Sequence, residues 1–272
     1  MDKDLIVIAN KLRKRIVETS SFSGIPHLGS CFSCLDLLVY LYWKELSIDP
    51  KNPNARNRDR FILSKGHGAP ALFQVLAEKD FFPFSRLNDF GKDGSFFHEH
   101  PPKPGYIPGI EAATGSLGHG LPMGLGMAIS SKLLNINYRT YVLISDGECN
   151  EGSIWEAALM APTLNLDKLT VIIDFNKWQA TGRSEEIMKL QPLSDKWRAF
   201  GWHVVEIDGH NFDEIGKSFS EVKVVNKKPS LIIAHTIKGK GVSFMEDDNN
   251  WHYRIPNNEE LKLAINELDS TK

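Results

Sequence analysis

Two apolar runs of the sequence end in polar residues that could bind a cation. "TYVLISDG" closes with Asp146 and Gly147, and "LTVIIDFN" closes with Asp174 and Asn176. Asp146 and Asn176 are 176 − 146 = 30 residues apart, about the length of a βαβ unit, so both should emerge at one edge of a sheet. A carboxylate oxygen, an amide oxygen and the backbone carbonyl of Trp178 are hard ligands suited to Mg²⁺, with Ca²⁺ as a substitute.

The loop after Asp146 is suited to an anion. Gly147 and Gly152 allow the backbone to approach a ligand closely, and a helix that begins near Ser153 would direct free N–H groups toward a negative charge. Together with the metal ligands, this pattern predicts a metal-bridged diphosphate. The ordinary alternative is a strand-to-helix turn in which Asp146 starts the loop and Ser153 caps the helix.

These loops require a scaffold, and the rest of the chain predicts one. Continuous apolar runs alternate with helical patterns, which is typical of an α/β fold with a parallel sheet and helices on both faces. In such sheets ligands bind outside the carboxyl ends of the strands. The runs of strand length are 60–64, 140–145, 169–174, 202–208 and 230–236, and the helical patterns are 35–46, 69–78, 121–134, 154–164, 192–200 and 212–225. Without a repeat or a low-complexity linker, we expect one domain over residues 1–272.

Composition excludes several classes of protein. The 32 Lys and Arg balance 34 Asp and Glu without a long run of one sign, which argues against a nucleic-acid partner. The N-terminus predicts an amphipathic helix rather than a signal peptide, and the longest apolar stretch, 31–43, is too short to span a membrane. We therefore expect a soluble, cytoplasmic protein without a membrane partner. The single C-x-x-C, Cys31 and Cys34, lacks a second ligand pair and predicts two small core thiols.

Histidines gather in two long loops and in the turns that follow helices and strands. The segment 92–120 is rich in Gly, Pro and His and too long for a routine connection, and 238–260 is a second such segment. Any one of these histidines alone would be read as a solvated loop residue. As a group they indicate a site that moves protons, because imidazole titrates near neutral pH. The five histidines in such contexts are His27, His67, His98, His100 and His119, of which His98 is expected to be a bystander.

An ordered series of motifs resembles the transketolase family. The motifs are "GIPHLGSCFSCLDLL", "DRFILSKGHGAPALF", "HEHP", "GIEAATGSLGHGLPMGLGMA", "DGECNEGSIWEAA", "IDFNKWQATG" and "AHTIKGKGVSF", and they run through nearly the whole chain in the family's order. The series is similar to the N-terminal, diphosphate-binding half of transketolase. The resemblance implies a thiamine-diphosphate-binding fold, with thiamine diphosphate and Mg²⁺ as cofactors.

Carried over residue by residue, the resemblance assigns roles to the loop residues. Asp146, Asn176 and the Trp178 carbonyl would bind the metal, and His67 and His252 would contact the diphosphate. The other residues implied to border the cofactor are Gly115, Ser116, Leu117, Gly118, His119 and Gly147, with Asn176 counted among them. His27 and His100 would line the substrate channel, and Glu151 would lie at a subunit interface and communicate with the glutamate that activates the cofactor.

The resemblance also implies the reaction and a partner. A two-carbon ketol unit would pass from a ketose or its phosphate to an aldose or its phosphate. The pyrimidine-binding and C-terminal domains of the family do not follow Lys272, so we expect a separate C-terminal subunit, turnover only in its presence, and a heterotetramer. The alternatives are a deoxyxylulose-phosphate-type synthase, a 2-oxo acid decarboxylase or dehydrogenase component, or a non-catalytic cofactor-binding homologue.

Three positions depart from the family's pattern. Ser145 stands where the motif has its first Gly, Lys177 where a second Asn is frequent, and Tyr253 where a small residue is commoner. Ser145 would cost stability or affinity if the backbone there had a positive φ, which favours the non-catalytic alternative. Tyr253 would narrow the channel. Lys238 and Lys240 are read as solvated loop charges in preference to phosphate contacts.

Overall fold

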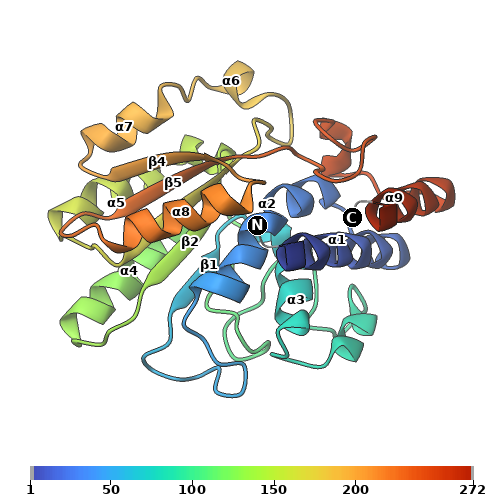
Figure 1. Cartoon of the computed structure of the whole chain (residues 1–272), viewed down its shortest axis with the longest axis horizontal. Helices are drawn as coiled ribbons and strands as arrows, with labels where there is room; N and C mark the ends of the chain where they lie inside the picture. The colour runs from blue at the N-terminus through green and yellow to red at the C-terminus, as the bar shows by residue number, and fades with distance from the viewer. Residues whose placement is uncertain (1–2, 271–272) are drawn as a thin grey trace.

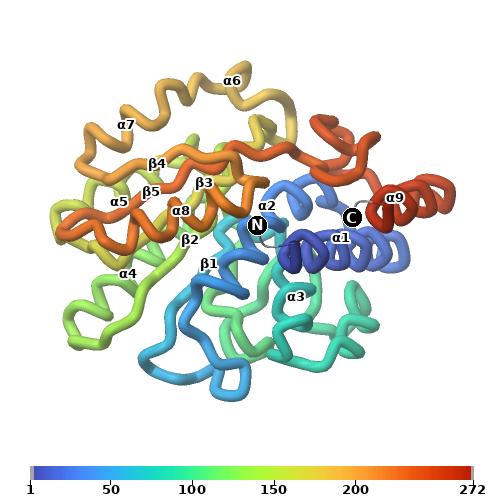
Figure 2. The backbone as a smooth tube through the Cα atoms, viewed as in Figure 1, coloured from blue at the N-terminus to red at the C-terminus, as the bar shows by residue number. Residues whose placement is uncertain are grey.

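The scaffold is a five-stranded parallel sheet, and the computed structural model describes residues 3–270. The strand order is β1-β2-β3-β5-β4, so the strands that carry the two polar termini, β2 and β3, are neighbours (Figure 1 and, for β3, Figure 2). Ser145 pairs in register with Asp174, which brings the two strand ends side by side. The strands are β1 (Arg60–Leu63), β2 (Thr140–Ser145), β3 (Leu169–Phe175), β4 (His203–Asp208) and β5 (Ser230–His235).

Helices cover both faces of the sheet, as the sequence predicts. One hydrophobic core lies under α1, α2, α3, α8 and α9, and the other lies under α4, α5 and α7. The long helices are α1 (Lys3–Ser23), α2 (Leu28–Tyr40), α3 (Ala69–Glu78), α4 (Gly120–Leu133), α5 (Gly152–Thr163), α8 (Phe212–Lys223) and α9 (Asn258–Ser270). The first and last helices, α1 and α9, pack together (Figure 1).

The predicted elements differ from the structure mainly at their ends. The second helix begins at Leu28, seven residues before the predicted start, because the small residues of "LGSCFSC" are buried against the rest of the chain and tertiary packing overrides their weak helix propensity. A short helix, α6 (Ser184–Ile187), precedes α7 (Leu193–Ala199) and was not predicted. Of these two, α7 packs beside β4 (Figure 2).

The cysteines and the helix lengths agree with the reading of the sequence. Cys31 and Cys34 lie in the buried interior of α2, and burial raises the pKa of each thiol to about 12. Thiols of this kind are unreactive near neutral pH. Within residues 3–270, each helix is too short or too polar to cross a lipid bilayer.

Candidate active site

A cavity of about 550 Å³ opens at the carboxyl edge of the sheet. Its walls come from the loops that follow β1, β2, β3 and β5, where ligands bind in parallel sheets. The turn before α2 and the long segment before α4 complete the lining. The predicted site residues that line it are His27, His67, His100, Gly115, Leu117, Gly147, Asn176, Trp178 and His252. The structure thus brings together side chains from both ends of the sequence.

The remaining predicted residues lie around this cavity. Asp146 is buried between the lining residues Ser145 and Gly147. Ser116, His119 and Glu151 are exposed and do not line the cavity. Gly118 is buried at φ 83°, where a β-carbon would come within 2.6 Å of the Glu151 β-carbon, so these two residues pack directly together.

Asp146 has the surroundings of a metal ligand. Its oxygens accept hydrogen bonds from the Gly147 N–H at 3.0 Å and the Ser184 hydroxyl at 2.7 Å. Among residues 3–270, Asp146 has no Lys or Arg within ion-pair distance, and burial raises the pKa of its carboxyl to about 7. A buried carboxylate without a direct cationic partner fits a bound cation.

Asn176 is held with its amide oxygen toward the same region. Its Nδ2 donates to Asp174 at 3.3 Å and to the Ser33 hydroxyl at 3.4 Å, and its Oδ1 accepts from the Trp178 N–H at 3.0 Å. Both amide hydrogens therefore have acceptors, which fixes the orientation of the group. The oxygen donors of this set match the ligands that Mg²⁺ and Ca²⁺ prefer.

A buried ion pair lies next to Asn176. Lys65 and Asp174 are both fully buried and form a salt bridge, and Asp174 also accepts from Ser33 at 2.6 Å and from the Thr236 hydroxyl. Burial opposes ionisation of Asp174, but Lys65 and the two hydroxyls hold the pKa of this carboxyl below its ordinary value. The pair joins the ends of β1, β3 and β5 under the cavity. Sequence reasoning missed Lys65, although its place just after a strand was a usable signal.

Four histidines converge on the cavity. The ring centroid of His27 lies 5.4 Å from that of His67, 5.1 Å from that of His252 and 6.4 Å from that of His100. Burial and neighbouring cationic groups lower the pKa of His27 to about 4 and that of His252 to about 3, and they hold the pKa of His67 well below its ordinary value. His27, His67 and His252 are therefore neutral at pH 7 and can each donate and accept one hydrogen bond.

Lys238 is buried, and the expectation of a solvated loop charge was wrong for this residue. Its Nζ donates to Asn249 Oδ1 at 2.7 Å and lies 3.0 Å from His252 Nδ1. Burial, with the charge of Lys65, lowers the pKa of Lys238 to about 8. The loop after β5 turns back over α2, and this contact buries Lys238. In the sequence, only its position three residues beyond a strand indicated a role. Lys240 is partly exposed and pairs with Glu246, as expected of a solvated loop charge.

Glu148, an acid to which the sequence analysis gave no role, holds the loop that contains Gly118. Its buried carboxylate accepts from the Gly118 N–H at 3.0 Å, from the Ser145 N–H at 2.9 Å and from the Ser64 hydroxyl. Ser145 ends β2 and does not have a positive φ. Its hydroxyl accepts a hydrogen bond from the Glu148 N–H at 3.3 Å. The substitution of Gly by Ser at this position therefore carries no backbone strain.

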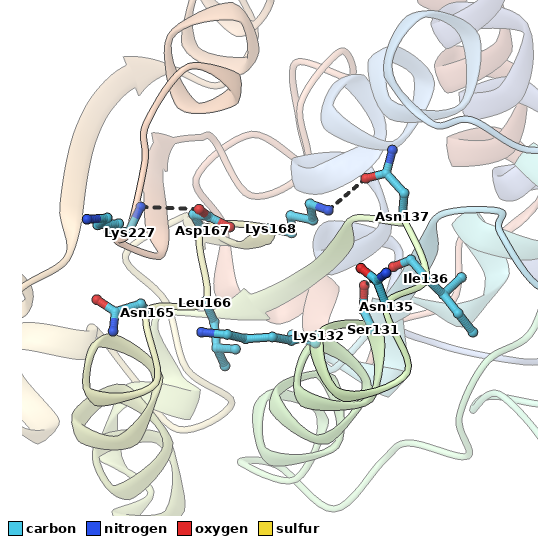
Figure 3. Close-up of a pocket in the computed structure, with 11 residues that line it drawn as sticks. Ser131, Lys132, Asn135, Ile136, Asn137, Asn165, Leu166, Asp167, Lys168 and Lys227 are labelled. Atoms are coloured by element: carbon cyan, nitrogen blue, oxygen red, sulfur yellow. Dashed lines mark hydrogen bonds between the residues drawn. The ribbon is translucent and has the colours of Figure 1, made fainter.

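A larger cavity, about 670 Å³, lies at the opposite edge of the sheet, near the amino ends of the strands (Figure 3). Lys168 donates to Asn137 at 2.7 Å, and Lys132 donates to the carbonyl of Leu164 at 2.7 Å. The ammonium groups of these lysines are thus engaged by the chain itself. None of the predicted site residues lines this cavity, and it lacks the convergent histidines of the carboxyl edge.

Known proteins resemble this chain over nearly its whole length. The family model described as "Transketolase, thiamine diphosphate binding domain" matches residues 5–268. The chain is 43% identical over 260 residues to one of the subunits of the apulose-4-phosphate transketolase of Phocaeicola vulgatus, covering 96% of this chain and 92% of that protein. It is 43% identical over 266 residues to the 6-deoxy-6-sulfo-D-fructose transketolase subunit SqwG of Clostridium sp. strain MSTE9, covering 98% and 96%.

The solved structure of transketolase from Leishmania mexicana superposes with a TM-score of 0.86 at 25% identity. The match covers 97% of this chain and 44% of that one, so the chain spans less than half of that transketolase. The family model and the two relatives each extend over nearly all of the present sequence. The chain therefore belongs to the transketolase family, as a member that carries its thiamine diphosphate binding domain.

Proposed function

We propose that this chain is the cofactor-binding subunit of a two-chain transketolase that transfers a two-carbon ketol unit between sugars or sugar phosphates. The observation that carries the proposal is the cavity that His27, His67, His252 and Asn176 line, with the carboxyl of Asp146 buried between its lining residues Ser145 and Gly147. Its two relatives described above are named as transketolase subunits, and the chain covers nearly their whole length.

The residues divide into a metal end and a histidine end. Asp146, Asn176 and the carbonyl of Trp178 would hold Mg²⁺, and Gly147 leaves room for a diphosphate beside it. His67 and His252 would contact the diphosphate, and the buried ammonium of Lys238, 3.0 Å from His252 Nδ1, would offset its charge. When bound, thiamine diphosphate supplies the nucleophilic carbon and the electron sink that cleavage beside a carbonyl requires.

Within the substrate channel, His27 and His100 would orient and exchange protons with sugar hydroxyls. His27 is suited to this because it is neutral near pH 7 and its Nδ1 is buried without a hydrogen-bond partner among the described residues. A neutral imidazole accepts a hydroxyl hydrogen at one nitrogen and donates at the other. Tyr253, whose ring lies 5.8 Å from that of His27, narrows the mouth of this channel.

The proposal includes a second, separately encoded chain with the pyrimidine-binding domain, and a heterotetramer in the cytoplasm. Glu151 is exposed beside the cavity, where it can meet such a partner. The test is to mix the two purified chains with thiamine diphosphate and Mg²⁺ and to follow ketol transfer from a panel of ketoses and ketose phosphates. Transfer only in the mixture is expected. Consumption of pyruvate in place of a ketose, or no transfer from any donor, would contradict it.

A further inference from the structure

Two loops border the cavity and carry different parts of the candidate site. Residues 176–183 follow β3 and include Asn176 and Trp178, and residues 238–252 follow β5 and include Lys238 and His252. The loops come from adjacent strands of the sheet, but neighbouring strands do not by themselves fix the relative positions of the loops beyond them. Something else must hold the metal end against the histidine end.

One carboxylate joins these loops. Asp247 accepts two hydrogen bonds from the guanidinium of Arg183, at 2.7 and 2.6 Å, and a third from Trp178 Nε1 at 2.8 Å. The Arg183 guanidinium also stacks on the Trp178 indole, 3.7 Å from the ring centroid. Paired parallel hydrogen bonds and stacking on an aromatic face give an arginine a defined geometry that a simple surface ion pair lacks.

The same residues connect directly to the candidate ligands. The Asp247 N–H donates to the Lys238 carbonyl at 2.8 Å, and the Trp178 N–H donates to Asn176 Oδ1 at 3.0 Å. Asp247 has a left-handed backbone, with φ 59°, a conformation that a non-glycine residue adopts only where its surroundings favour it. Asp247 thus contacts Lys238 directly, and Trp178 contacts Asn176 directly.

The solvent exposure of these side chains is typical of an ordinary surface ion pair, but the geometry of their contacts is not. The side chains of Arg183 and Asp247 are 34% and 56% exposed, and exposed ion pairs contribute little because water screens them. Here, however, three donors converge on one carboxylate and the contact bridges two loops, with a further bond from Asn249 Nδ2 to the Ala180 carbonyl at 3.1 Å. The contact between Arg183 and Asp247 is therefore expected to fix the relative position of the two loops without changing the free energy of unfolding.

We propose that Trp178, Arg183 and Asp247 form a latch that positions the metal-binding loop against the loop of Lys238 and His252. They are positioning residues. The identity of the cofactor rests on the proposed function, whereas the latch itself rests on the contacts described above. A ligand that spans both ends of the cavity would bind tightly only when the latch holds both loops in place.

The test compares Asp247→Asn and Arg183→Leu with a matched control. Asn tolerates the left-handed backbone, so Asp247→Asn removes the charge without new strain. Arg198→Leu is the control, since Arg198 pairs with Asp195 on α7, both side chains are exposed, and neither residue lines the cavity. Hydrogen exchange of the cofactor-free chain, read by mass spectrometry, should rise over both 176–183 and 238–252 in each latch variant and over neither segment in the control.

The second readout is cofactor affinity, measured by calorimetry with Mg²⁺ and thiamine diphosphate on the chain assembled with its pyrimidine-binding partner. Each latch variant should bind about tenfold more weakly with an unchanged urea midpoint, and the double variant should be no worse than either single one. Faster exchange confined to the substituted loop, or additive losses, would overturn the latch. Failure of the unaltered chain, assembled with its partner, to bind cofactor would instead overturn the proposed function, while the exchange experiment would still decide the latch.

Discussion

Substitution of Lys65 by Met should destabilise the protein strongly, because it leaves a buried carboxylate without its cation. Lys65 and Asp174 are both 0% exposed and in direct contact. Removal of one partner of such a pair costs about 3–5 kcal/mol, and the hydroxyls of Ser33 and Thr236 compensate only part of the lost charge interaction. By the usual scaling this corresponds to a fall in the melting temperature of about 6–20 °C.

The assay is urea unfolding followed by circular dichroism, with Lys92→Met as the control. Lys92 pairs with Asp89 at the surface, with both side chains more than 60% exposed, and its loss should change the free energy of unfolding by less than about 0.5 kcal/mol. Without Lys65, burial should raise the folded-state pKa of Asp174 above its unfolded value, so the deficit should shrink as the pH falls and the carboxyl takes up a proton. Equal effects of the two substitutions at pH 7, or a deficit that does not depend on pH, would refute the reasoning.

Three further predictions concern buried residues around the cavity. Glu148→Ala should lower the free energy of unfolding by about 2–4 kcal/mol and weaken cofactor binding, because it leaves buried donors of Gly118, Ser145 and Ser64 unpaired. Urea unfolding measures the stability and calorimetry measures the cofactor affinity. An unchanged urea midpoint would contradict this prediction. Because the pKa of Lys238 is lowered to about 8, its charge is present below that pH and lost above it. The affinity for the diphosphate should therefore fall about tenfold between pH 7 and pH 9. Lys238→Arg should remove this pH dependence. Gly118→Ala should destabilise the chain by more than about 1 kcal/mol, because φ is 83° and the new β-carbon would meet Glu151, whereas Gly126→Ala, which meets open space, should not.

The sequence predicted the parallel sheet because its strands are continuous apolar runs and its turns carry strong signals. β2 (Thr140–Ser145) matches the predicted run, and α3 (Ala69–Glu78) matches its predicted helix. The start of α2 was missed, since small residues such as Gly29 give no hydrophobic period and form a helix here only because packing holds them.

The candidate site was predicted only in part. The strand-end rule found Asp146 and Asn176, and the resemblance to a family supplied the roles of the histidines. Lys65 and Lys238 escaped because a lysine in a polar loop is usually solvated, and burial of its charge depends on partners far away in the sequence, as Asp174 is for Lys65. Asp247 was missed for the same reason, since its partners lie on another loop.

The most direct test of the proposed site is the dependence of cofactor binding on the metal. Thiamine diphosphate is titrated calorimetrically into the chain assembled with its pyrimidine-binding partner, with and without Mg²⁺, for the unaltered protein and for Asp146→Ala. We expect tight binding only with Mg²⁺ in the unaltered protein, and the loss of that metal dependence in Asp146→Ala. Equal affinity in all four titrations would contradict a metal-bridged diphosphate at Asp146 and Asn176.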